Sequence, residues 1–188
     1  MNKNFILASQ SPQRKSLLEQ IGYVPMKTEP ANIDETPLPK EKPSQYVKRM
    51  AREKALFVFE KNKQVVLGAD TVIVCGRKII QKSYDDEEQT KVMKLLSGRN
   101  HKVLTAVCVV NESGKIAERL NVTKIKMKKL SKQEIKEYVD SKEWVGCAGY
   151  KIEGLLGAFV ENINGSYSGV VGLPLYEARN LLIGAGVI

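Results

Sequence analysis

The chain opens with a short apolar run followed by a segment of helical periodicity. The run "FILA" (residues 5–8) has no polar interruption, which is typical of a buried strand. Apolar residues then recur at helical spacing up to Ile21. Pro12 suits the first turn of this helix, where a missing N–H costs nothing, and Gly22 suits its end. The pattern predicts a strand that leads directly into a helix.

A proline-rich segment separates this unit from a long amphipathic helix. Residues 25–43 hold five of the seven prolines, with acidic residues between them, and this composition predicts an ordered loop or a lid. Residues 44–62 then show an apolar stripe at helical spacing, formed by Tyr46, Val47, Met50, Ala51, Ala55 and Val58.

The remaining pattern alternates strands and helices, with several hairpins. We expect "VVLGAD" (65–70) to be a buried strand that ends in a turn, and residues 71–80 to form two strands around Gly76 and Arg77. Further elements are a helix over 85–96, strands over 101–110 and 118–128 joined at "NESGK", a helix opened by the capping box "SKQE" (131–134), and strands and a terminal helix over 148–182. This order predicts one mixed α/β domain over residues 1–188, in two lobes with a cleft between them.

Composition narrows the class of protein. No apolar run approaches the ~20 residues of a membrane helix, so no membrane partner is expected. The three cysteines lie in apolar segments and suggest reduced thiols in a cytoplasmic protein, and a single histidine makes a zinc site improbable. The net charge of +9 attracts polyanions, including nucleotides, but it also fits a lysine-rich proteome. Without a nucleic-acid motif or an aromatic platform, no nucleic-acid partner is expected.

The corner between the first strand and helix gathers groups that suit an anion. A helix N-terminus presents free N–H groups, Ser9 and Ser11 add hydroxyls, and Arg14 can bind phosphate through two N–H groups. These features suggest a cradle for a triphosphate. A simple serine N-cap beside solvated cations explains the same segment, and the segment alone favours that simpler interpretation.

Asp70 stands out at the end of a very apolar run. Because an unpaired buried carboxylate is costly, Asp70 must cap a turn, pair with a cation or bind a metal. Gly68 would let another group approach the backbone closely, and Thr71 adds a short polar side chain. Local sequence leaves a catalytic aspartate and a turn cap equally open.

Several charged residues gain meaning only as a group. Glu35, Lys54, Lys82 and Glu153 would each suit a solvated surface, yet a triphosphate site needs carboxylates for Mg²⁺ and lysines for the phosphoryl charge. His101 could act as a base, although a histidine that starts a strand is more often a structural hydrogen-bonding group.

Six ordered motifs carry a family resemblance: "LASQSPQRKSLL", "MAREKA", "LGADTVIV", "LSGRNHKVLTAV", "AGYKIEG" and "INGSYSGVVGLPL". In order and spacing they resemble the Maf family of septum-formation-inhibitor-like nucleoside triphosphate pyrophosphatases. The resemblance implies an elongated, twisted mixed sheet flanked by helices, similar to the inosine-triphosphatase type, with the nucleotide in a cleft. It implies hydrolysis of an NTP to NMP and pyrophosphate with Mg²⁺ or Mn²⁺. Clearance of modified nucleotides, arrest of cell division and a homodimer are further expectations.

The resemblance also assigns roles to individual residues. Asp70 matches the group that activates water, and Glu35 with Asp70 matches the metal site. The triphosphate ligands are matched by Ser9, Arg14, Lys54 and Lys82. The presence of all these residues argues against the alternative of a division-regulating interaction protein with weak or no catalysis.

Three positions bear on the nucleotide base. Thr71 matches the dTTP- and UTP-preferring branch, "YKIEG" with Glu153 resembles the 7-methyl-GTP-preferring branch, and Gln13 matches neither. An ionised carboxylate only accepts hydrogen bonds, so Glu153 suits guanine or cytosine amino groups and would be repelled by uracil carbonyls. Gln13 cannot stack on a cationic purine as tryptophan would. We therefore expect a broader or altered base preference that leans to bases with amino donors.

Overall fold

One mixed sheet runs through the whole molecule. The computed structural model describes residues 4–187. Within this range the strands are β1 (Ile6–Ala8), β2 (Lys27–Thr28), β3 (Val66–Cys75), β4 (Lys78–Ile80), β5 (Asn100–Val110), β6 (Ile116–Met127) and β7 (Val160–Asn164). Their order is β2-β1-β3-β5-β6-β7, with β4 also paired to β3. Strand β1 is parallel to β2 and β3, and the other pairs are antiparallel, so the predicted mixed sheet is confirmed.

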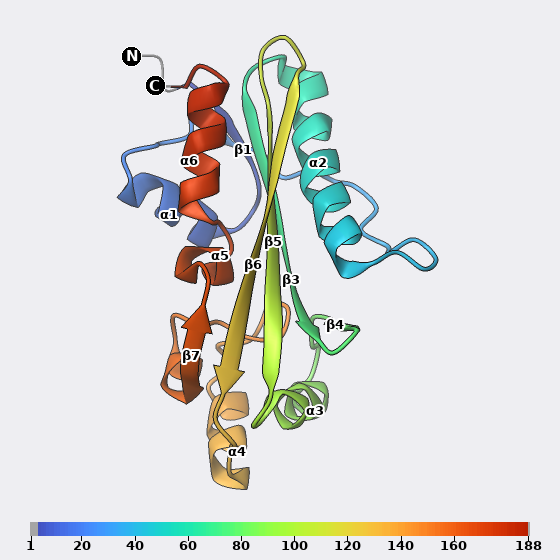
Figure 1. Ribbon diagram of the computed structural model, residues 1–188, viewed down its shortest axis with the longest axis vertical. Coiled ribbons are helices and arrows are strands. Elements are labelled where there is room, and N and C mark those ends of the chain that lie inside the picture. Colours follow the sequence, from blue (N-terminus) through green and yellow to red (C-terminus); the bar gives the residue numbers. More distant parts are fainter. Residues whose placement is uncertain (1–3, 188) are drawn as a thin grey trace.

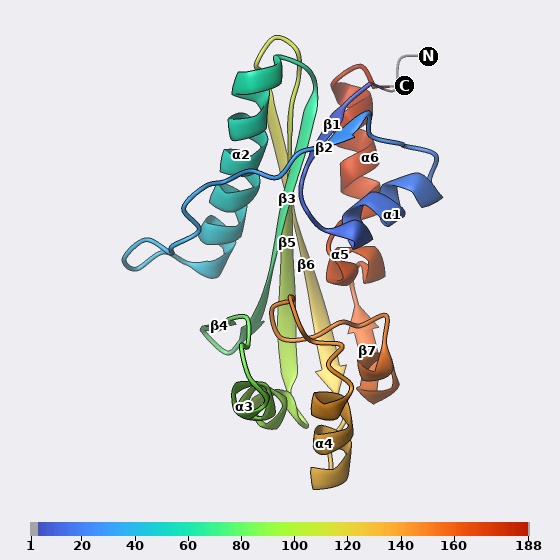
Figure 2. The same cartoon turned by 180° about the vertical axis from the view of Figure 1, so that it is seen from behind.

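Helices cover both faces of this sheet and one of its ends. They are α1 (Pro12–Gln20), α2 (Pro43–Asn62), α3 (Asp86–Leu96), α4 (Lys132–Asp140), α5 (Tyr167–Val171) and α6 (Leu175–Gly184), with a 3₁₀ helix at Leu155–Phe159. In Figures 1 and 2, α2 lies along one face of the long, twisted strands, and α1 and α6 lie along the other. Helices α3 and α4 pack together at the lower end of the sheet in Figure 1. The expectation of an elongated sheet flanked by helices is confirmed. None of the described helices is both long and apolar enough to cross a bilayer.

Strand β3 is buried on both faces, which explains its continuous apolar sequence. Side chains alternate across a strand, so Val72 and Val74 pack in the cluster beneath α2. Leu67 and Ala69 pack in the opposite cluster, with residues of α1 and α6. A third cluster, around Met93 and other residues, fills the lower end. The division into two lobes within one domain stays a prediction, and residues 1–3 and 188 lie outside the described range.

Two element predictions are wrong. No turn follows Asp70: β3 continues through it to Cys75, because β5 provides a partner for each residue from Val66 to Val74. The segment over 148–159 is not a strand either. It has one isolated bridge and a 3₁₀ helix, and Gly149 breaks the extended chain with a φ of 78°.

Apart from β2 (Lys27–Thr28), which lies in the predicted loop over 25–43, most helix boundaries and the hairpins agree with the sequence. Ser11 caps α1 and Pro12 is its first residue. Ser131 and Glu134 form the predicted capping box of α4. Gly76, with a φ of 63°, occupies the turn between β3 and β4. Local capping and turn chemistry therefore predicted these boundaries well.

Candidate active site

The candidate site lies where a short strand ends beside a long one. Strand β1 pairs with β3 only as far as Ala8 opposite Gly68, and β4 pairs with β3 only from Ile73 onward. Asp70 and Thr71 lie on the stretch between these two pairings. Beyond Ala8 the chain leaves the sheet and enters α1, so the N-terminus of this helix faces the open stretch of β3.

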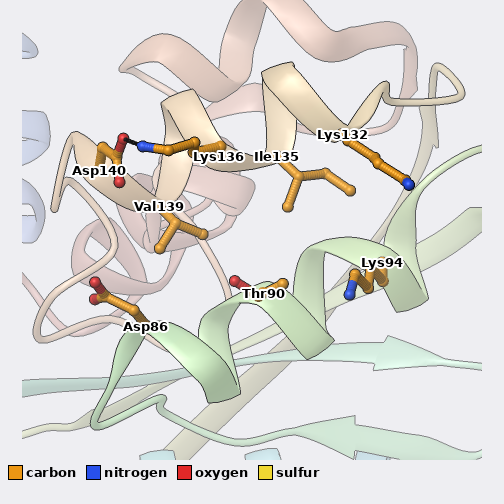
Figure 3. Close-up of a pocket in the computed structure, with 8 residues that line it drawn as sticks. All are labelled: Asp86, Thr90, Lys94, Lys132, Ile135, Lys136, Val139 and Asp140. Atoms are coloured by element: carbon orange, nitrogen blue, oxygen red, sulfur yellow. Dashed lines mark hydrogen bonds and ion pairs between the residues drawn. The ribbon is translucent and has the colours of Figure 1, made fainter.

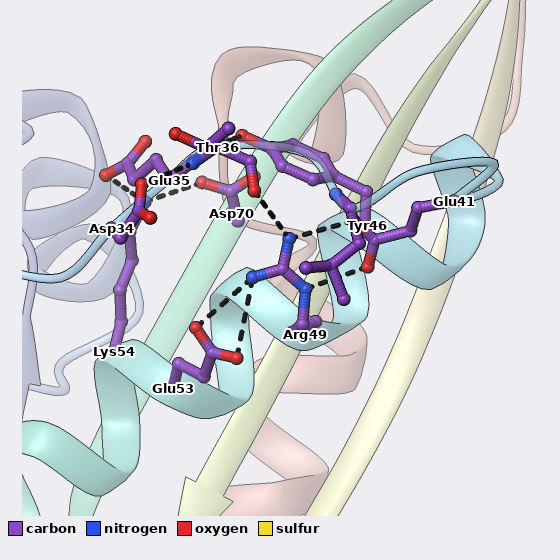
Figure 4. A network of polar contacts seen from close by, with 10 residues as sticks. Asp34, Glu35, Thr36, Glu41, Tyr46, Arg49, Glu53, Lys54 and Asp70 are labelled. Atoms are coloured by element: carbon purple, nitrogen blue, oxygen red, sulfur yellow. Dashed lines mark hydrogen bonds and ion pairs between the residues drawn. The ribbon is translucent and has the colours of Figure 1, made fainter.

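Helix α2 supplies a lysine to Asp70 across a close contact with β3. A side chain at Gly68 would place its Cβ 2.5 Å from the carbonyl oxygen of Ala51, so only glycine allows this approach. Lys54, one turn further along the helix, then places its Nζ 2.7 Å from Asp70 Oδ1 and 3.0 Å from Glu35 Oε1 (Figure 4). The predicted close approach at Gly68 is confirmed, and Asp70 is the cation-paired carboxylate of the three possibilities.

Burial controls the protonation of Asp70. The residue is 8% exposed, and its burial raises the pKa of the carboxyl above the ordinary 3.8. The cations Lys54 and Arg14 oppose this shift, while Glu35 adds to it. A raised pKa makes a carboxylate a stronger base once it is ionised.

Ser9 and Arg14 form a second polar group at the start of α1. Ser9 Oγ accepts hydrogen bonds from Arg14 Nη1 and from the N–H of Ser11, both at 3.1 Å. With these two hydrogen bonds accepted, the hydroxyl proton of Ser9 remains for donation. Burial lowers the pKa of Arg14, opposed by Asp70 and Glu35, and a guanidinium stays charged in proteins.

Arg14 is also fixed against β3 and α5. Its Nε donates to the carbonyl of Gly172 at 2.9 Å, and its Nη2 donates to Thr71 Oγ1 at 3.4 Å. Thr105 on β5 lies 3.1 Å from Thr71 Oγ1 and donates to the carbonyl of Gly169 at 2.7 Å. Thr105 was not predicted from the sequence as a site residue. It carries the same signal as Asp70, because it is a polar residue inside a continuous apolar strand.

Gln13 lies half-buried at the same helix end. Its Oε1 accepts a hydrogen bond from Ser11 Oγ at 3.1 Å, which orients the amide. The Nε2 group then remains as a donor. The predicted residues thus form two contact groups, one of Asp70, Lys54 and Glu35 and one of Ser9, Arg14, Thr71 and Gln13, and Arg14 acts electrostatically on Asp70 and Glu35 of the first group.

The other two predicted residues are Lys82 and Glu153. Among residues 4–187, no hydrogen bond or ion pair joins Lys82 or Glu153 to Asp70, Lys54 or Arg14. Both act electrostatically on Cys147. Burial raises the pKa of that thiol, and Lys82 and Glu153 act on it in opposite directions.

His101 makes a buried structural hydrogen bond, as expected for a histidine that starts a strand. It is 3% exposed, and its Nε2 lies 2.6 Å from the hydroxyl oxygen of Tyr150. Burial lowers the pKa of His101 to about 4, so the ring is neutral near pH 7. The three cysteines are free thiols, as expected.

The carboxylates fit a hard divalent cation. Glu35 and Asp70 converge on one ammonium group, so their oxygens already face a common positive charge. No cluster of three or more metal-ligating side chains occurs in the part of the chain that the structure describes. Mg²⁺ is commonly bound by one or two carboxylates together with substrate phosphates, and a pair of carboxylates matches that pattern.

A separate hollow lies between α3 and α4. It measures about 400 Å³ and is lined by Asp86, Thr90, Lys94, Lys132, Ile135, Lys136, Val139 and Asp140 (Figure 3). Its charged groups include exposed ion pairs such as Lys136 with Asp140, which contribute little stability. None of the residues predicted for the site lines this hollow.

Comparison with known proteins identifies the family. A model described as "Maf-like protein" matches residues 4–185. The chain belongs to the Maf-like protein family. The chain is 48% identical to a dTTP/UTP pyrophosphatase of Caulobacter vibrioides, over 96% of this chain and 95% of that protein. It is 47% identical to a nucleoside triphosphate pyrophosphatase of Ehrlichia ruminantium, over 95% of this chain and 94% of that protein.

Solved structures give more distant likenesses. A dITP/XTP pyrophosphatase of Mycobacterium abscessus has a TM-score of 0.47 and 12% identity, covering 68% of this chain and 75% of that one. A HAM1 protein of Coxiella burnetii has a TM-score of 0.46 and 16% identity, covering 68% and 73%. The assignment to the Maf-like family therefore depends on the sequence matches alone.

Proposed function

We propose that this Maf-like protein is a nucleoside triphosphate pyrophosphatase that hydrolyses NTPs to NMP and pyrophosphate. The observation that carries the proposal is the contact of Lys54 with both Glu35 and Asp70, beside Arg14 at a helix N-terminus. Carboxylates and cations are thus arranged as a polyphosphate and its metal would require. The names of the relatives in Caulobacter and Ehrlichia support the same reaction class.

In this proposal the chain's own residues bind the triphosphate and move one proton. The Ser9 hydroxyl donates a hydrogen bond to a phosphate oxygen. Arg14 donates further hydrogen bonds from the N–H groups that its protein contacts leave free. Asp70 accepts the proton of the attacking water, for which its raised pKa suits it. Lys54 stabilises the negative charge that develops on the phosphoryl group. A divalent cation held by Glu35 and Asp70 would neutralise phosphate charge.

In the proposal, Gln13, Thr71 and Glu153 recognise the nucleotide base. Lys82 is a further triphosphate ligand, across a cleft between the two lobes. The names of the relatives favour dTTP and UTP. Glu153 favours bases with amino donors, such as CTP, GTP and 7-methyl-GTP. A role in clearing modified nucleotides, an influence on septum formation, a cytoplasmic location and a homodimer stay expectations from the resemblance.

The test is pyrophosphate release from a panel of standard and modified NTPs with Mg²⁺ or Mn²⁺. We expect release from at least one NTP, and a loss of about 10²- to 10⁴-fold in kcat for Asp70→Asn, the range for removing a general base. Asp86→Asn is the matched control, because Asp86 is an exposed residue paired with Lys142. Absence of release from every NTP, or equal activity of Asp70→Asn, would contradict the proposal.

A further inference from the structure

The loop that carries Glu35 has no regular structure of its own. Residues 29–42 lie between β2 and α2 without a helix or strand, and the Glu35 side chain is half exposed. A carboxylate on such a loop keeps its position only if other groups hold the backbone.

Two side chains of α2 bind consecutive carbonyl groups of the loop. The Tyr46 hydroxyl donates to the carbonyl of Glu35 at 2.9 Å, and Arg49 Nη2 donates to the carbonyl of Thr36 at 3.0 Å (Figure 4). Tyr46 is 9% exposed, and its ring lies 5.6 Å from the guanidinium carbon of Arg49. The backbone is thus held at two successive carbonyl oxygens, those of Glu35 and Thr36.

Arg49 is itself fixed by the far end of the same loop. Its Nε and Nη2 donate to the two oxygens of Glu41, each at 2.8 Å, in a bidentate pair. The hydrogen bond from Arg49 lowers the pKa of Glu41 to about 2, so this carboxylate stays charged at neutral pH. Glu41 Oε2 in turn accepts the N–H of Leu38 at 2.9 Å. The Arg49 guanidinium therefore links two parts of the loop, the carbonyl group of Thr36 and the carboxylate of Glu41.

Helix α2 thus contacts both the backbone and the carboxylate of Glu35. Tyr46 and Arg49 lie one turn apart, and Lys54 follows on the same helix with its Nζ against the Glu35 carboxylate. We infer that Tyr46 and Arg49 are positioning residues that hold Glu35 against Lys54, in place to share a divalent cation with Asp70. This inference rests on the proposed function for the metal role of Glu35, but the hold on the loop can be measured without it.

The first measurement is amide hydrogen exchange of Thr36 and Leu38 in the metal-free protein, since Pro37 between them has no N–H. We expect exchange about three- to tenfold faster in Tyr46→Phe and Arg49→Gln, the range for losing one hydrogen bond. Arg52→Gln is the matched control, because Arg52 lies on the same helix but pairs with Glu118 of β6 at 2.7 Å. Unchanged exchange in both variants, or equal acceleration in the control, would overturn the inference.

The second measurement is Mn²⁺ binding, followed by electron paramagnetic resonance in the presence of a non-hydrolysable NTP analogue. We expect the half-saturating Mn²⁺ concentration to rise about three- to tenfold in Tyr46→Phe and Arg49→Gln. In a Glu35→Gln background the same substitutions should cause no further rise, whereas a general loss of stability would weaken binding in both backgrounds. An equal rise in both backgrounds would overturn the positioning role. Failure of the wild type to bind Mn²⁺ would contradict the metal site of the proposed function, and the exchange result would still decide whether the loop is held.

Discussion

The residues expected to act on one substrate fall into two groups that differ in how they are built. Asp70 and Lys54 lie on a central strand and a long helix, and they contact each other directly. Glu153 lies in an irregular segment, and Lys82 makes only an isolated bridge to Ala148. In the proposal, Asp70 and Lys54 are thus in contact before substrate arrives, whereas Lys82, a proposed triphosphate ligand, and Glu153, proposed to recognise the base, make no hydrogen bond or ion pair with them among the described residues.

Replacing Lys54 by methionine removes the cation that contacts Asp70. We expect a fall of roughly 10²- to 10³-fold in kcat, because the variant loses a cation, 12% exposed, that would face the developing charge. Lys48→Met is the matched control, since Lys48 lies on the same helix but pairs with Glu118. Steady-state pyrophosphate release measures both, and a similar fall in both variants would remove Lys54 from the centre.

Gly68→Ala tests the packing that creates the contact between Lys54 and Asp70. The new Cβ would lie 2.5 Å from the Ala51 carbonyl oxygen, so α2 must move outward, at a cost of about 1–3 kcal/mol in the free energy of unfolding. Because a 1 Å misplacement can cost 10²-fold in rate, we expect activity to fall by up to about that factor. Urea denaturation and activity measure the two effects.

Gly184→Ala is the matched substitution on α6. An added Cβ meets nothing within 4 Å there, so a gain of up to ~1 kcal/mol is expected instead. If Gly68→Ala were as stable and active as the wild type, the tight contact between α2 and β3 would not be required.

The pH dependence of activity tests the proposed role of Asp70 as a proton acceptor. Burial raises the pKa of Asp70 above 3.8, and only the ionised form can accept a proton, so kcat/KM should rise with pH through that raised value. Lys54 lowers this pKa, so Lys54→Met should move the acid limb to higher pH. The folded protein binds this proton more tightly than the unfolded chain does. The associated stability is therefore present below pH 3.8 and lost as pH rises through the folded pKa. An acid limb unmoved in Lys54→Met would contradict the assignment of Asp70.

The sequence signalled the contact of Asp70 with a cation better than the contacts of the loop around Glu35, for a physical reason. An aspartate in an apolar strand must find a partner, and Gly68 marked where a helix approaches, so both signals lay within three residues of each other. Loop packing gave no comparable signal: the contacts of Tyr46 and Arg49 with the chain near Glu35 depend on tertiary structure. The absence of a turn after Asp70 was also hidden, since only pairing with β5 shows that the strand continues.

The smallest expected effect concerns Glu153 and the base. Replacing its carboxylate by an amide in Glu153→Gln supplies a donor for uracil carbonyls, so the ratio of kcat/KM for UTP to that for CTP should rise about tenfold. Glu161→Gln is the matched control, because Glu161 lies at the same end of the sheet and pairs with Lys126. Competition assays with both nucleotides measure the ratio. Two outcomes would show that other residues recognise the base. One is a wild-type kcat/KM for dTTP and UTP at least tenfold above that for GTP, 7-methyl-GTP and CTP. The other is a UTP-to-CTP ratio that Glu153→Gln leaves unchanged. Gln13 would then be the first residue to test, because its Oε1 accepts a hydrogen bond from Ser11 at the N-terminus of α1, which leaves its Nε2 group as a donor.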